Sequence, residues 1–291
     1  MSQIVRLRAH AKVNLTLDVL GLRADGYHDI DSVMTQLELA DQIQLTARAD
    51  GRIAVDTNEP KLACDESNLV YQAAQALVPY CRSARGVDIF IDKRIPMAAG
   101  LGGGSADAAS VLVGLNQLWS LQLEDDELAA IGAHLGSDVP FCVYGGCARV
   151  RGRGERVERI WHRPRGWVVL ARPPQSQLFS GDIYRCFDEM AAKRPAAPYT
   201  PGMLEALAQG DGRLLASRMG NHLEPAVMEA EPVIIDIRRI IMARDQSWGV
   251  CVSGSGPTVV ALVSDRQAGA TLVQQLMAAG VAQGLLTRFK E

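Results

Sequence analysis

The chain has 291 residues, which is enough for two domains that each bury a hydrophobic core. Its net charge of −3 and isoelectric point near 6.0 leave no broad basic surface for a nucleic acid or an anionic membrane, so neither partner is expected. The sequence shows no signal-peptide core, no apolar run of about eighteen residues, and no Cys-x-x-Cys or His-x-x-x-His pair, which predicts a soluble cytoplasmic protein without a zinc or iron site.

Residues 3–20 alternate between apolar and polar side chains, which predicts one long strand or two short ones. Lys12 interrupts an otherwise ordinary strand sequence. Because side chains alternate between the two faces of a strand, Lys12, Asn14 and Thr16 share one polar face. Taken alone, this segment is best interpreted as an edge strand with one solvated face.

A turn-rich connection follows, in which Asp25-Gly26 directly precedes Tyr27 and His28. An aromatic ring and an imidazole side by side on a loop could stack on a planar heterocycle and hydrogen-bond to it. Equally, Tyr27 could only attach the loop to the core. This segment leaves the two interpretations open.

Two further elements precede the first glycine-rich segment. Residues 30–47 are predicted to be a strand with a turn at Ala40-Asp41. A helix is predicted to begin after Asn68, which is a plausible N-cap that could also reach a ligand. The cap alone explains this asparagine adequately.

A glycine-rich loop separates a predicted strand over 87–95 from a helix predicted from Ser105 onward. Four of the five residues 100–104 are glycines, so the backbone there can present bare N–H groups. The helix that follows adds its unpaired N–H groups and the positive end of its dipole, which favours phosphate oxygens as ligands. A tight turn with Ser105 as N-cap is the alternative, and the number of glycines favours phosphate.

Two common nucleotide motifs do not fit this loop. The P-loop requires a Gly-Lys dipeptide, and the chain has none. The dinucleotide pattern would place Ser105 or Asp107 where a small Gly or Ala must pack helix against strand. A nicotinamide-dependent enzyme is therefore disfavoured.

The acidic run 124–127 predicts the start of a helix that reaches His134, since acidic side chains suit the positive end of the helix dipole. Gly136 is expected to end this helix, and Asp138 follows in a sharp turn before an apolar run. An aspartate in a turn usually accepts a local backbone hydrogen bond, so Asp138 alone is more often structural than catalytic.

Residues 149–165 are rich in Arg and Gly, and this change of composition places a domain boundary near residue 160, between domains 1–160 and 161–291. The second half is expected to be a small sheet covered by helices on one face. Its predicted elements are a strand over 167–171, helices over 180–192, 202–209 and 224–243, two strands flanking a second Gly/Ser loop at 253–258, a helix over 267–279 and a strand over 285–289.

In combination, these features suit phosphoryl transfer. This reaction needs an anion cradle, a cation near the transferred group and a carboxylate that accepts the proton of the attacking hydroxyl. The glycine loop, Lys12 and Asp138 supply one of each.

The run Pro96-x-x-x-Gly100-Leu101-Gly102-Gly103-Gly104-Ser105 resembles the nucleotide loop of the GHMP kinases, the superfamily of galactokinase, homoserine kinase, mevalonate kinase and phosphomevalonate kinase. Four further segments, in family order, resemble the family of these kinases that acts on 4-diphosphocytidyl-2-C-methyl-D-erythritol; they are residues 11–15, 23–28, 136–141 and 253–258. The resemblance implies an α+β, two-domain architecture: an N-terminal mixed α/β domain, a C-terminal ferredoxin-like α/β sandwich and an active site in the cleft between them.

The resemblance also implies an activity, namely ATP-dependent phosphorylation of the 2-hydroxyl of the methylerythritol moiety in the non-mevalonate route to isoprenoid precursors. Asp138 would be the base toward this hydroxyl, and Lys12 its cationic partner. Tyr27 and His28 would hold the cytidine. The remaining substrate residues implied are Phe179, stacking on the other face of the base, and Asn14 and Thr258, lining the cleft.

The same resemblance implies ATP and Mg²⁺ as cofactors. The ATP phosphates would be wrapped by Pro96, Met97, Ala98, Ala99, Gly100, Leu101, Gly102, Gly103, Gly104, Ser105 and Ala106, with Asn68 and Lys93 near the nucleotide. Ser105 and Glu127 are the metal ligands implied, although the helix start also explains Glu127. Ala106 departs from the family, which often has a second serine there, so Ser105 must supply the hydroxyl contact alone.

Two alternatives remain at this stage. The first is another GHMP kinase, acting on mevalonate, homoserine or a sugar, against which only the Tyr27-His28 segment argues strongly. The second is a non-catalytic nucleotide-binding relative, against which the presence of both Lys12 and Asp138 counts. In each case the expected partner is a small molecule, and the expected state is a monomer or weak homodimer.

Overall fold

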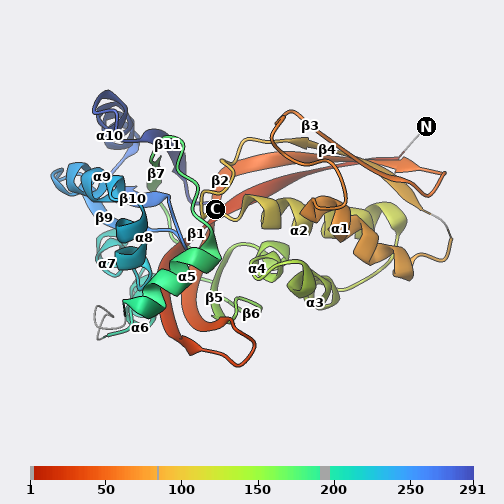
Figure 1. The fold of residues 1–291 in the computed structure, drawn as a ribbon, viewed down its shortest axis with the longest axis horizontal. Helices are drawn as coiled ribbons and strands as arrows, with labels where there is room; N and C mark the ends of the chain where they lie inside the picture. The colour runs from red at the N-terminus through yellow and green to blue at the C-terminus, as the bar shows by residue number, and fades with distance from the viewer. Residues whose placement is uncertain (1–2, 84, 191–196) are drawn as a thin grey trace.

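The computed structural model describes residues 3–83, 85–190 and 197–291, which form two sheets with helices packed against them (Figure 1). The larger sheet has seven strands and the smaller sheet has four. The strands of the larger sheet are β1 (Ile4–Leu22), β2 (His28–Arg48), β3 (Ile53–Thr57), β4 (Gly86–Asp92), β5 (Cys147–Gly152), β6 (Arg156–Arg159) and β8 (Gly220–Asn221). The strands of the smaller sheet are β7 (Trp167–Arg172), β9 (Ser247–Val252), β10 (Val259–Val263) and β11 (Gln283–Arg288).

The smaller sheet confirms the predicted ferredoxin-like arrangement. Its strand order is β11-β7-β10-β9, and each neighbouring pair is antiparallel. Helices connect β7 to β9 and β10 to β11, so the chain follows a β-α-β-β-α-β path.

The first two strands form one long antiparallel hairpin, with irregularities in register at three places along β1. β1 lies between β2 and β8, so it is not an edge strand. The expectation of a solvated polar face is therefore wrong: Lys12, Asn14 and Thr16 are 4%, 1% and 0% exposed. The predicted turn at Ala40-Asp41 is also wrong, because both residues pair with β1 within continuous strand β2.

Helices cover one face of the larger sheet (Figure 1). They are α1 (Leu69–Leu77), the short 3₁₀ helix η1 (Val78–Tyr80), α2 (Gly103–Trp119), α3 (Asp125–Leu135) and α4 (Val139–Tyr144). Ile43 and Ile89 from the sheet and Leu112 from α2 are fully buried together in this core. Helix α2 packs on β1 and β2 through this core, which fixes the helix that follows the glycine loop.

Both faces of the smaller sheet are buried. Val169 of β7 packs with the helices of the second half, while its neighbour Leu170 packs with Val13 and Leu15 of β1. This alternation follows from the period of two along a strand, and it joins the two halves of the chain through a shared core. The helices of the second half are α5 (Ser180–Glu189), α6 (Thr200–Gln209), α7 (Gly212–Ser217), α8 (Glu224–Ala230), α9 (Val233–Met242) and α10 (Arg266–Ala278).

Two predicted helices differ in extent. The predicted helix 224–243 is two helices, because Pro232 lacks a backbone N–H and starts a new helix, α9. The predicted helix 180–192 ends at Glu189, and its positions 191–192 lie outside the described residues.

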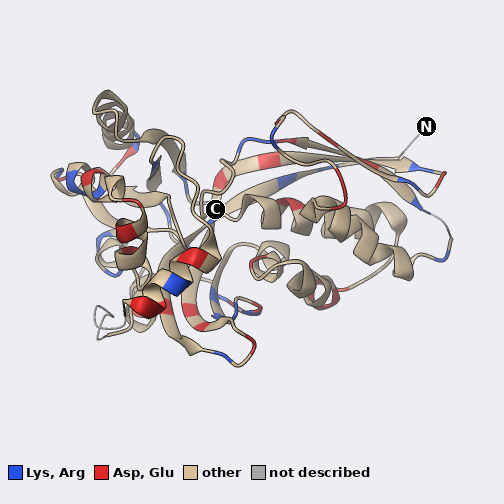
Figure 2. Ribbon diagram, viewed as in Figure 1, with Lys and Arg blue, Asp and Glu red and all other residues tan. Residues whose placement is uncertain are grey.

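The predicted boundary at residue 160 falls between β6 and β7, which belong to different sheets. The short strand β8 nevertheless returns from the second half to pair with β1. Acidic and basic residues are interspersed in both halves (Figure 2). Within the described ranges, no helix has the length and apolar character needed to cross a membrane.

Candidate active site

The glycine loop runs from the end of β4 to the start of α2 and passes directly over Lys12. Helix α2 begins at Gly103, two residues earlier than predicted, because Gly102 takes a left-handed conformation with φ +65° at the N-cap. A Cβ at Gly102 would lie 2.7 Å from Cγ of Lys12. Glycine is thus required there by both conformation and space, and Ser105 lies within the first turn of α2 instead of capping it.

Backbone and hydroxyl contacts hold this loop against β1 and against the second Gly/Ser loop. The backbone N–H of Lys12 donates to the carbonyl of Leu101 at 2.9 Å. Ser253 Oγ donates to the carbonyl of Gly100 at 3.0 Å and accepts from the backbone N–H of Asn14 at 3.2 Å. Segments from three distant parts of the chain therefore meet at one place.

A buried lysine and a partly exposed aspartate are in contact beside the loop. Lys12 Nζ lies 3.0 Å from Asp138 Oδ2 and donates to Asn14 Oδ1 at 2.9 Å. The Asn14 amide is oriented by its own donation to Ser32 Oγ at 2.8 Å. Asp138 precedes α4 and makes no side-chain capping bond, so the local structural role considered for this aspartate is wrong.

These groups line a cleft of about 580 Å³ between the two halves of the chain. Lys12, Gly100, Ser105 and Asp138 come from the first half, and Tyr184, Gly254 and Ser255 come from the second. The side chains of Asp138 and Lys12 are 28% and 5% exposed, so the carboxylate is open to the cleft while its cation is protected from water.

Aromatic rings also line the same cleft. The rings of His28 and Tyr184 stack, with centroids 4.7 Å apart and planes inclined by 25°. His28 Nε2 lies 3.0 Å from Asp188 Oδ1, and the guanidinium carbon of Arg153 lies 5.1 Å from the ring centroid of Tyr27. Burial raises the pKa of Tyr184, which keeps its hydroxyl protonated.

Comparison with known proteins identifies the family. Residues 68–146 match the family model of the GHMP kinases N terminal domain, and residues 203–282 match that of the GHMP kinases C terminal. A Brevibacillus brevis protein named 4-diphosphocytidyl-2-C-methyl-D-erythritol kinase is 45% identical over 259 residues, covering 89% of this chain and 87% of its own length. The chain belongs to the family of 4-diphosphocytidyl-2-C-methyl-D-erythritol kinases, among the GHMP kinases. A family member from Shouchella clausii is 45% identical over 257 residues, 88% of this chain and 85% of the relative.

Solved structures agree with this assignment to the GHMP kinases. A crystal structure of 4-(cytidine 5'-diphospho)-2C-methyl-D-erythritol kinase matches with a TM-score of 0.81 at 30% identity, covering 99% of this chain and all of the other. A homoserine kinase from Cytophaga hutchinsonii matches with a TM-score of 0.76 at 20% identity over the whole of this chain and 95% of its own, which supports the shared fold.

Within this GHMP kinase, the predicted substrate residues are only partly brought together. Asn14, Tyr27 and His28 line the cleft. Phe179 does not; it precedes α5 and is 69% exposed. Tyr184, more than one helical turn later, lines the cleft instead, and it was not predicted from the sequence. No local signal marked Tyr184, because an aromatic residue on an amphipathic helix is normally assigned to the core.

Thr258, the other predicted substrate residue, is 1% exposed and does not line the cleft. Its backbone carbonyl accepts from the N–H of Ser253 at 2.9 Å, and this contact closes the second loop. Thr258 therefore lies behind the residues that line the cleft.

Three residues assigned to the nucleotide or metal also lie outside the cleft lining. Asn68 caps α1 by accepting from the Val70 N–H at 2.9 Å, as its sequence context predicted. Glu127 is exposed and accepts from the Glu124 N–H at 2.9 Å in a capping box, so the helix start is sufficient to account for it. Lys93 is buried between two carboxylates.

Proposed function

We propose that this protein transfers the γ-phosphoryl group of ATP to the 2-hydroxyl of 4-diphosphocytidyl-2-C-methyl-D-erythritol, in the non-mevalonate route to isoprenoid precursors. The observation that carries the proposal is the Lys12–Asp138 contact of 3.0 Å, placed in one cleft with the glycine loop and the stacked rings. A small-molecule acceptor and a cytoplasmic site of action are parts of the same proposal.

In the proposed reaction, Asp138 accepts the proton of the 2-hydroxyl as its oxygen attacks the γ-phosphorus. The new O–P bond forms, the bond from the γ-phosphorus to the bridging oxygen breaks, and ADP leaves with the bonding electrons. Lys12 pairs with the Asp138 carboxylate and offsets the charge that develops on the phosphoryl oxygens. Because the ammonium is buried and already oriented by Asn14, it needs little rearrangement during the reaction.

GHMP kinases use ATP, and in this chain the loop over residues 96–106 is the proposed phosphate cradle. The N-terminus of α2, a helix of 17 residues, supplies free N–H groups and the positive end of a dipole. The glycines at positions 102–104 leave these groups open to phosphate oxygens.

Mg²⁺ is a further part of the proposal. The described residues contain no group of three or more His, Cys, Asp or Glu side chains that could hold a metal by themselves. This fits Mg²⁺, which is usually held by substrate phosphates and water with one or two protein groups. Ser105 lines the cleft and is the candidate for that contact. When bound, the ion would neutralise phosphate charge.

The aromatic lining of the cleft is proposed to hold the cytidine diphosphate part of the acceptor. The ring of Tyr27 is 52% exposed and available for stacking, and the His28–Tyr184 pair offers a rigid platform. Arg153 and Arg185 also line the cleft, where their positive charge suits a diphosphate. The proposal therefore replaces Phe179 with Tyr184 as the second aromatic contact.

Measurement of ADP release with a panel of acceptors tests this function. We expect turnover with the cytidylyl substrate to exceed turnover with mevalonate, homoserine or galactose by at least about 1,000-fold in kcat/KM, because a site built for polar recognition discriminates strongly. Preference for one of the other acceptors would instead assign another GHMP activity. ATP binding without turnover on any acceptor would support a non-catalytic relative.

Removal of the stacking ring tests the cytidine site. Tyr184→Ala is expected to raise KM for the cytidylyl substrate by about tenfold or more, because stacking on a base contributes roughly 1–3 kcal/mol. KM for ATP should stay unchanged. Phe179→Ala is the matched control, since this exposed ring lies outside the cleft. Steady-state kinetics with each substrate varied in turn will distinguish the two, and a larger effect of Phe179→Ala would contradict the assignment.

A further inference from the structure

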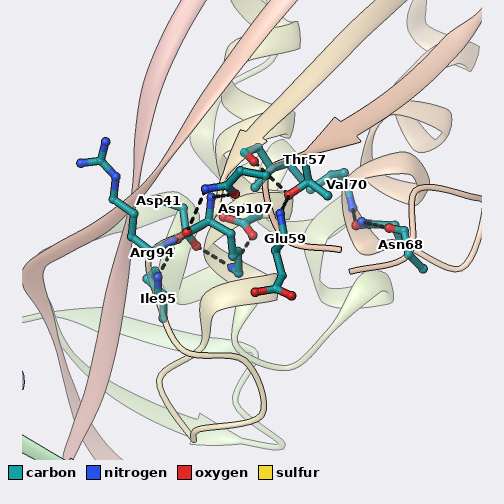
Figure 3. A network of polar contacts seen from close by, with 12 residues as sticks. Asp41, Thr57, Glu59, Asn68, Val70, Arg94, Ile95 and Asp107 are labelled. Atoms are coloured by element: carbon teal, nitrogen blue, oxygen red, sulfur yellow. Dashed lines mark hydrogen bonds and ion pairs between the residues drawn. The ribbon is translucent and has the colours of Figure 1, made fainter. Parts of the chain in front are cut away.

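Three charged side chains form a buried cluster behind the glycine loop (Figure 3). Lys93 Nζ lies 2.5 Å from Asp41 Oδ2 and 2.7 Å from Asp107 Oδ2. The side chains of Asp41, Lys93 and Asp107 are 0%, 5% and 3% exposed. Removing three charged groups from water costs free energy, so we expect this buried cluster to have a specific role.

The cluster connects the two ends of the loop. Asp41, on β2, accepts from the backbone N–H groups of Arg94 and Ile95 through Oδ1, at 2.5 Å and 2.7 Å, where the chain leaves β4 (Figure 3). Asp107 is the fifth residue of α2, just after the loop. The single ammonium group of Lys93 therefore bridges an anchor at the start of the loop to an anchor at its end.

The ammonium group also lies directly behind the first residue of α2. A Cβ placed on Gly103 would be 3.0 Å from Lys93 Nζ. Lys93 does not line the cleft, and its nitrogen donates to Asp41 and Asp107. It therefore contacts the start of α2 from outside the cleft.

The charges of the cluster do not balance when both aspartates are ionised. Asp107 Oδ1 is buried without a hydrogen-bond partner among the described residues. Lys93 therefore compensates at most one of the two carboxylates that it contacts.

We propose that Lys93 is a positioning residue for the nucleotide: by bridging Asp41 and Asp107, it holds both ends of the glycine loop in the geometry that receives the phosphates. This rests on the proposed role of the loop in ATP binding. A glycine-rich loop loses much conformational freedom when it is ordered, and a scaffold that orders it beforehand lowers that cost at binding. Lys93 therefore acts on the nucleotide through the loop and not by contact.

Asp107→Ala tests the proposal, because it removes the tether to α2 and leaves Lys93 paired with Asp41. The variant should fold, since loss of one carboxylate balances the remaining charges and alanine favours helix. We expect the Kd for ADP, measured calorimetrically without any acceptor, to rise about tenfold, with KM for ATP rising in parallel. KM for the acceptor should stay unchanged and Tm should not fall.

Two further variants make the result specific. Asp107→Asn keeps an oxygen acceptor for Lys93 and should restore most of the ADP affinity; equal weakening in both variants would contradict the tether. Asp88→Ala is the matched control, because Asp88 lies on β4, the strand that leads into the loop, and its substitution removes a surface ion pair with Arg48 and should leave the Kd unchanged. An unchanged Kd in Asp107→Ala would overturn the proposal. ADP binding requires no acceptor. An unchanged Kd for ADP would therefore overturn the role of Lys93 whether or not the acceptor is assigned correctly.

Discussion

Asp138→Asn is expected to lower kcat by about two orders of magnitude or more, with ATP binding nearly intact. The amide has the size of the carboxylate, so the cleft should keep its shape, but it cannot take the proton of the attacking hydroxyl. Asp138 is placed for this task because its carboxylate is open to the cleft on one side and contacts Lys12 on the other. Single-turnover kinetics with saturating ATP will measure the loss in the chemical step.

The matched control for this variant is Asp126→Asn. Asp126 accepts from the Tyr144 hydroxyl at 2.6 Å and does not line the cleft, so its substitution should leave kcat unchanged. Turnover near the wild-type rate in Asp138→Asn would remove this carboxylate from the mechanism. A large rise in the Kd for ADP would indicate a binding role instead.

Lys12→Met is expected to lower kcat by roughly 10²–10³-fold, the range seen when one preorganised electrostatic contact is removed. Methionine keeps the unbranched stem that packs beneath Gly102, so the loop should keep its place. The loss should fall on kcat more than on KM for ATP, because Lys12 faces the carboxylate that accepts the proton. Steady-state kinetics and nucleotide calorimetry will separate the two.

The double variant Lys12→Met, Asp138→Asn extends this test. Residues that act as a unit give strongly non-additive effects, so the double variant should be only slightly slower than the slower single variant. Fully additive losses would mean that the two groups act independently, contrary to their contact. Lys290→Met serves as control, since this half-buried lysine hydrogen-bonds to Gln36 outside the cleft and should not affect kcat.

Local patterns predicted the parts of the site that depend on nearby residues. The strand before Pro96, the glycine loop and the helix after it follow from alternation, backbone freedom and helical spacing. Asn68 was predicted as an N-cap, and it caps α1. Resemblance of short motifs added the family, which the comparisons confirm.

The failures share a cause. Ala40-Asp41 has the composition of a turn, yet Asp41 is buried in β2 because Lys93 and two backbone N–H groups satisfy its carboxylate. Tyr184 was missed, because an aromatic residue on an amphipathic helix is normally assigned to the core. Lys93, the partner of Asp41, and His28, the partner of Tyr184, are distant in sequence from these residues. No local pattern therefore indicates either contact.

By itself, the sequence determined where most strands and helices and the glycine loop occur, because these depend on side-chain period, glycine content and capping within a few residues. Only the tertiary structure decided that Lys12 meets Asp138, that Tyr184 and not Phe179 faces the cleft, and that Lys93 is held behind the loop. These outcomes depend on contacts between distant segments, where packing of the two sheets and neutralisation of buried charge outweigh local preference.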